Sequence, residues 1–103
     1  MRVISQDGKI DLPYENLAIF VEYENVIARF ENERYLLAQY SSEAKAIKAM
    51  EMLREHNEGV IFLKTIINTE KGTPFVSGLS KTDFNKLTQN YFQFPQDDDE
   101  RLN

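Results

Sequence analysis

Residues 1–40 consist of short apolar runs separated by polar turns, a pattern typical of β-strands. The first two runs flank the pair Asp7-Gly8, which readily adopts the positive φ angles of a tight turn. We therefore expect a hairpin over Met1–Leu12, and Pro13 should end its second strand because proline donates no hydrogen bond to a β-ladder.

The next three apolar runs are joined by linkers short enough for hairpins. Consecutive strands with such linkers pair with their neighbours in antiparallel fashion, so these runs predict a β-meander. The three runs are 17–23, 26–30 and 35–40.

The apolar spacing then changes to three and four residues, which predicts an amphipathic helix over 42–57. Ser41 or Ser42 can cap its start, and Gly59 offers a left-handed stop at its end. The predicted core stripe consists of Ala46, Ile47, Ala49, Met50 and Leu53.

The run at 60–67 is rich in β-branched residues and predicts a buried strand. A loop and a short helix over 81–90 follow, with Ser80 and Asp83 three residues apart as in a capping box. A closing strand over 91–94 should place Phe92 and Phe94 on one face.

These elements predict an α+β domain over 1–95, in which two helices cover one face of an antiparallel β-meander. Four consecutive carboxylates follow Pro95, and little apolar surface accompanies them. We interpret 96–103 as an acidic, solvated C-terminal tail whose deletion leaves the domain folded.

The net charge of -5 opposes binding to a phosphate backbone, so direct nucleic-acid binding is disfavoured. With 103 residues the chain has room for one core. The absence of cysteine fits a reducing cytoplasm, and the longest apolar run is too short to cross a bilayer. We expect a cytoplasmic protein without a membrane partner.

Candidate catalytic residues are sparse. His56 is the only histidine, and Glu55 and Asn57 should project at other angles around the helix, so we interpret it as structural and expect His56→Ala to preserve stability and function. The run Lys71-Gly72-Thr73 lacks the leading glycine of a phosphate loop. We predict no enzyme activity and no cofactor.

The acidic residues are the candidate binding residues. Contiguous carboxylates in a tail lack the spacing of a calcium loop, so we expect no metal site. A negatively charged ridge on the meander, joined by the tail, can instead meet a basic protein surface or imitate a phosphate backbone, although such carboxylates can also simply be solvated. The ridge and tail residues are Glu22, Glu24, Glu31, Glu33, Asp97, Asp98, Asp99 and Glu100.

Three blocks of sequence together resemble a group of small phage and mobile-element proteins of Firmicutes that have no assigned activity. The blocks are ISQDGKIDLPYE at 4–15, AQYSSEAKAIKAMEMLRE at 38–55 and YFQFPQDDDE at 91–100. The resemblance implies a bacterial cytoplasm and an accessory gene of a mobile element. Small acidic proteins in that setting are often inhibitors of host defence, including anti-CRISPR proteins.

The leading hypothesis is therefore non-enzymatic inhibition of a host defence protein with a basic surface, such as a CRISPR nuclease, by acidic mimicry of nucleic acid. The alternative is a homo-oligomeric sponge for a small signalling nucleotide, with Tyr35 or Phe75 as stacking rings. A sponge needs clustered cations, whereas those considered for it are scattered along the sequence: Lys64, Lys71, Lys81 and Lys86. A third hypothesis is a phage protein that assists assembly or regulation.

Overall fold

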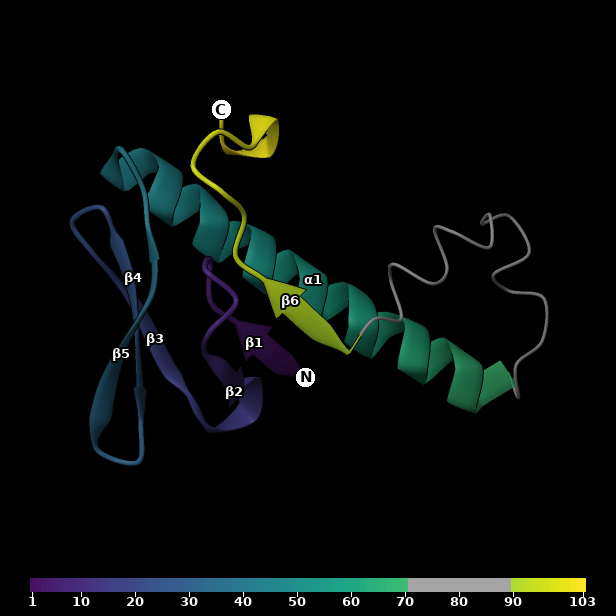
Figure 1. Ribbon diagram of the computed structural model, residues 1–103. Coiled ribbons are helices and arrows are strands. Elements are labelled where there is room, and N and C mark those ends of the chain that lie inside the picture. Colours follow the sequence, from purple (N-terminus) through teal and green to yellow (C-terminus); the bar gives the residue numbers. More distant parts are fainter. Residues whose placement is uncertain (71–89) are drawn as a thin grey trace.

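The computed structural model describes residues 1–70 and 90–103, within which a long helix packs against two three-stranded sheets (Figure 1). The α+β class is confirmed. No described helix combines the length and apolar character needed to cross a membrane. The described elements, in order, are β1 (Arg2–Ile4), β2 (Asp11–Pro13), η1 (Tyr14–Asn16), β3 (Ala18–Glu22), β4 (Asn25–Phe30), β5 (Glu33–Gln39), α1 (Glu43–Glu70), β6 (Tyr91–Gln93) and η3 (Glu100–Leu102).

The predicted meander forms one sheet, in the antiparallel order β3-β4-β5. Two residues, Tyr23 and Glu24, connect β3 to β4, and Glu31 and Asn32 connect β4 to β5. The second turn has φ angles of 51° and 67°, both positive as a type I′ hairpin requires. The short polar linkers therefore predicted the strand pairing correctly.

The predicted N-terminal hairpin is also present, with Val3 opposite Leu12 in the antiparallel pair β1-β2. The predicted closing strand β6 exists, but it pairs in parallel with β1, placing Phe92 opposite Val3. It therefore completes a second sheet, in the order β2-β1-β6, instead of extending the meander. This pairing joins the two ends of the chain.

Helix α1 begins close to its predicted start, and the Ser42 hydroxyl accepts a hydrogen bond from the Lys45 amide at 3.3 Å. It continues to Glu70, so the predicted stop at Gly59 and the predicted strand over 60–67 are wrong. Gly59 does not adopt a left-handed φ. Extending an existing helix adds one hydrogen bond per residue, which outweighs a glycine penalty of about 1 kcal/mol.

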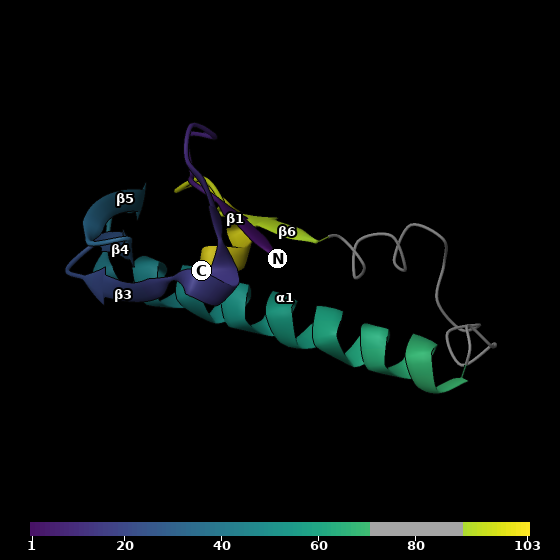
Figure 2. The ribbon, with the colours of Figure 1, turned by 90° about the horizontal axis from the view of Figure 1, so that it is seen from below.

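The second predicted helix, over 81–90, lies outside the described residues except for Asn90. The described residues therefore include a single long helix in contact with the sheets. Figure 2 shows both sheets on one side of α1 and its C-terminal half extending beyond them.

The hydrophobic core lies between α1 and the two sheets. Ala46, Ala49 and Leu53 are buried as predicted, and the small alanines permit close approach of the helix to the strands. Ile47, in contrast, is 44% exposed, and Met50 is only partly buried. The helix thus contacts the strands along a narrower stripe than the sequence pattern predicts.

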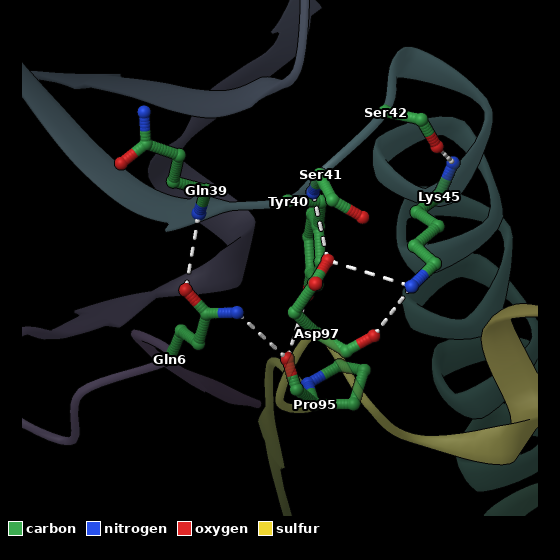
Figure 3. A network of polar contacts seen from close by, with 8 residues as sticks. All are labelled: Gln6, Gln39, Tyr40, Ser41, Ser42, Lys45, Pro95 and Asp97. Carbon is green, nitrogen blue, oxygen red and sulfur yellow. Dashed lines mark hydrogen bonds and ion pairs between the residues drawn. The ribbon is translucent and has the colours of Figure 1, made fainter.

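The segment 96–103 is folded, and its interpretation as a solvated tail is wrong. Its Leu102 is 5% exposed and joins the core. The Asp97 carboxylate accepts a hydrogen bond from the Ser41 amide at 2.7 Å, and Lys45 Nζ donates to the Asp97 carbonyl at 2.8 Å (Figure 3). The buried Leu102 and the contacts of Asp97 with the start of α1 hold the segment against the domain.

The Pro95 carbonyl connects the two sheets. It accepts hydrogen bonds from the Tyr40 hydroxyl at 2.9 Å and from Gln6 Nε2 at 3.2 Å (Figure 3). Gln6 Oε1 in turn accepts from the Gln39 amide at 3.1 Å. Burial raises the pKa of Tyr40, so its hydroxyl stays protonated and donates throughout the neutral range.

Leu53→Asp should unfold the domain, because it places an unpaired carboxylate at a position that is 1% exposed, at a cost of several kcal/mol. Ile47→Asp, on the exposed side of the same helix, is the matched control and should change stability little. Urea denaturation of both variants checks this. Equal stability of the two would mean that the described core is wrong.

Deletion of 96–103 should lower the melting temperature by at least about 8 °C, because burial of a leucine such as Leu102 contributes about 2 kcal/mol or more. Within this segment, Asp97→Asn should destabilise and Asp98→Asn, at an exposed position without a hydrogen bond to the described residues, should not. Differential scanning calorimetry checks both. An unchanged melting temperature after the deletion would restore the interpretation as a solvated tail.

The same contact gives stability a pH dependence. The Ser41 amide hydrogen bond lowers the pKa of Asp97 below its ordinary value of 3.8, so the folded state binds this proton less readily than the unfolded chain. The contribution is present above 3.8 and is lost as pH falls through the lowered folded value. Asp97→Asn should flatten the stability profile in that window.

Candidate functional site

The acidic residues predicted on the meander occupy two ends of the sheet. Glu22 ends β3 and Glu24 lies in the β3–β4 turn, whereas Glu31 lies in the β4–β5 turn and Glu33 begins β5. The intervening strand β4 has six residues and thus spans about 17 Å. The two pairs of carboxylates therefore lie at opposite ends of the meander, as consecutive hairpin turns do, and their role as a negatively charged ridge stays a prediction.

Several of these carboxylates have internal partners. Glu22 forms an ion pair with Arg34, whose guanidinium lies over the Phe20 ring at 5.7 Å from its centroid. Glu33 accepts a hydrogen bond from the Tyr35 hydroxyl at 3.1 Å, which raises the pKa of Tyr35. Such partners reduce the negative charge available to a binding surface.

Two of the four C-terminal carboxylates also have partners within the protein. Asp97 holds the start of α1, and Asp99 accepts a forked pair of hydrogen bonds from the Arg101 guanidinium at 2.9 and 2.7 Å. These bonds lower the pKa of Asp99 to about 2. Asp98 and Glu100 are exposed and make no ion pair with the described residues.

One end of the molecule retains an acidic surface. The Tyr40 amide donates to the Glu24 carbonyl at 2.9 Å, and the neighbouring Ser41 amide donates to Asp97, so the β3–β4 turn and the C-terminal segment meet at the start of α1. Exposed carboxylates from Glu24 and Asp98 lie in this region. Glu31 and Glu33 do not belong to it.

A cavity of about 530 Å³ lies between α1 and the C-terminal segment. The α1 residues that line the cavity lie on successive turns along one face of the helix, because positions three and four apart in a helix lie above one another. Strand β6 and η3 supply the opposite wall. The lining residues are Lys48, Met52, Glu55 and His56 from α1, Phe92 from β6 and Arg101 from η3.

The cavity brings together two cations that are far apart in the sequence. Lys48 forms only a loose ion pair with Glu51 on the same helix, at 3.7 Å. Arg101 is anchored by Asp99, which raises the pKa of the guanidinium. Sequence reasoning missed this pair because the folding of the C-terminal segment onto α1 was not expected.

Two rings form one side of the cavity. The His56 and Phe92 ring centroids lie 5.8 Å apart, and Phe92 meets Phe94 edge-on at 5.3 Å. Phe92 is 8% exposed, in agreement with its predicted core role, whereas His56 is half-buried and is the more accessible ring. Glu55, the residue before His56 on the helix, lines the same cavity.

The lining set favours binding of an anion beside a planar group. It contains two permanent cations, one carboxylate, one imidazole and two apolar side chains. The lining includes neither a hydroxyl nor a thiol that could act as a nucleophile. Within residues 1–70 and 90–103, the acidic residues and His56 form no group of three that could hold a metal ion.

No family model matches this chain, and neither the curated proteins nor the solved structures include a match.

Proposed function

We propose that this protein acts by binding, without catalysis, and that its cavity sequesters a small phosphorylated ligand that carries an aromatic base, such as a signalling nucleotide. The observation that carries the proposal is the convergence of Lys48 and Arg101 beside the His56 ring on one cavity. Clustered cations are the feature that favours a nucleotide sponge over an acidic mimic, and the carboxylates expected on the meander lie at two ends of the sheet.

The lining chemistry fits each part of a nucleotide. A phosphate accepts charge-assisted hydrogen bonds from Lys48 and from the N–H groups of Arg101 that Asp99 leaves unused. A base stacks on the His56 imidazole, and Glu55 accepts a hydrogen bond from an amino group or a ribose hydroxyl. The volume of about 530 Å³ lies within the usual range for small-molecule sites.

The proposed setting is a bacterial cell carrying a phage or mobile element, as the resemblance implies. A protein that binds a signalling nucleotide tightly lowers its free concentration and so prevents it from activating a host defence protein. This role needs affinity and abundance, and it needs no reaction.

The proposal includes a homo-oligomer. The C-terminal half of α1 extends beyond the two sheets (Figures 1 and 2). On that half, the Ile61 side chain is 55% exposed. A second copy packed on this helix would bury apolar surface and bring another chain toward the ligand.

A second candidate function is binding to a basic protein surface at the acidic end of the molecule. Tyr23, in the β3–β4 turn beside Glu24, is 76% exposed. Exposed tyrosines are frequent anchors of protein interfaces, and carboxylates around one favour a partner rich in lysine and arginine. In this second candidate function, too, the protein inhibits a host defence protein, for example a nuclease.

The double variant Lys48→Glu/Arg101→Glu should weaken nucleotide binding at least tenfold, since it replaces two attractive charges with repulsive ones. His56→Ala should weaken it several-fold without unfolding the protein, contrary to the expectation from sequence alone. Lys9→Glu, an exposed charge on the N-terminal hairpin, is the matched control. Isothermal titration calorimetry with mono-, di- and cyclic nucleotides, and with inorganic phosphate, measures these affinities.

Absence of binding by the wild-type protein to every nucleotide would remove the sponge proposal. If inorganic phosphate bound as tightly as the nucleotides, the base would add nothing to the affinity, and the proposed stacking on His56 would be wrong. Sedimentation equilibrium on the same samples tests the oligomer, and a monomer with and without ligand would contradict the proposed self-association.

Reversal of charge at the acidic end, Glu24→Lys/Asp98→Lys, should abolish capture of a basic protein from a bacterial lysate if the second candidate is correct. Glu31→Lys, at the opposite end of the meander, is the control and should leave capture intact. Capture by the wild type should also weaken with salt, because exposed charges are screened over about 10 Å at 0.1 M. Equal capture by all three proteins would contradict an acidic docking surface.

A further inference from the structure

A second hollow lies on the other side of α1, where the helix meets η1 and β3. It has a volume of about 380 Å³. Met50, Leu53 and Arg54 line it from α1, about half a turn around the helix from the residues of the first cavity. The remaining lining residues are Tyr14, Glu15, Leu17 and Ile19.

Part of the lining of this hollow is apolar. Leu17, Ile19 and Met50 all pack against the core and are only partly buried. The periodicity of α1 places Met50 on the core stripe, and the hollow explains why its burial is incomplete. An apolar ligand of matching size would displace water from these apolar side chains and so stabilise the fold.

The charges at the rim favour an anionic ligand. The Glu15 carboxylate forms an ion pair with the N-terminal ammonium of Met1, which offsets its negative charge. Arg54 is exposed and makes no hydrogen bond or ion pair with any described residue. A guanidinium beside apolar side chains is suited to a carboxylate attached to a hydrocarbon body.

We propose that this hollow is a binding site for small monocarboxylates with an aliphatic or aromatic body. The body lies on Leu17, Ile19 and Met50, and the carboxylate pairs with Arg54. The inference does not rest on the nucleotide proposal, because the two cavities share no lining residue.

The test uses decanoate as the probe and decanol as its uncharged counterpart. Decanoate should bind, raise the melting temperature and give intermolecular nuclear Overhauser effects to the Met50 methyl group. Arg54→Gln should weaken decanoate binding about tenfold and leave decanol binding unchanged. Leu17→Phe, which fills the hollow with a larger apolar side chain, should weaken both.

Lys48→Gln, in the other cavity, is the matched control and should leave decanoate binding unchanged, which separates this site from the nucleotide site. Three results would overturn the proposal: no decanoate binding at millimolar concentration, equal affinity of wild type and Arg54→Gln, or decanoate contacts at Lys48 and His56. If Leu17→Phe fails to fold, the comparison of wild type with Arg54→Gln still decides the matter.

Discussion

The attachment of the C-terminal segment to the start of α1 determines much of this structure. Asp97 accepts from the Ser41 amide, Lys45 donates to the Asp97 carbonyl, and the neighbouring Pro95 carbonyl accepts from both Gln6 and Tyr40. A small group of polar contacts thus links the helix, the meander and the N-terminal hairpin. The donors come from different regions of the chain, so these contacts can form together only when the helix, the meander and the hairpin are all in place.

The candidate site depends on this attachment. Residues 91–103 carry Phe92 on β6 and Arg101 on η3, and their packing on α1 places both on one cavity with Lys48 and His56. The small side chains of Ala46 and Ala49 let α1 approach the strands closely along one stripe. Larger residues on either side of that stripe border the two cavities. The close packing along the stripe and the open space beside it therefore both result from the small alanines.

The local features of the fold could be predicted from the sequence. Alternation and short turns correctly predicted the meander, and Asp7-Gly8 the N-terminal hairpin, because such signals act between neighbouring residues. The end of α1 could not be predicted, since a short β-branched run fits a helix as well as a strand. The parallel pairing of β6 with β1 and the approach of Arg101 to Lys48 depend on contacts between distant regions of the chain, and no local pattern encodes them.

The acidic C-terminal run shows how composition can mislead. Four adjacent carboxylates suggested a solvated tail, yet Asp97 accepts a hydrogen bond from the Ser41 amide, Asp99 pairs with Arg101 within the segment, and Leu102 is buried in the core. The segment therefore contributes a cation to a cavity instead of an acidic surface alone. The measurement that tests this account most directly is a ¹H–¹⁵N NMR titration of the wild-type protein with a cyclic dinucleotide and with AMP. We predict saturable shifts at Lys48, His56 and Arg101 together, whereas shifts confined to the acidic end, or no shifts, would contradict the account.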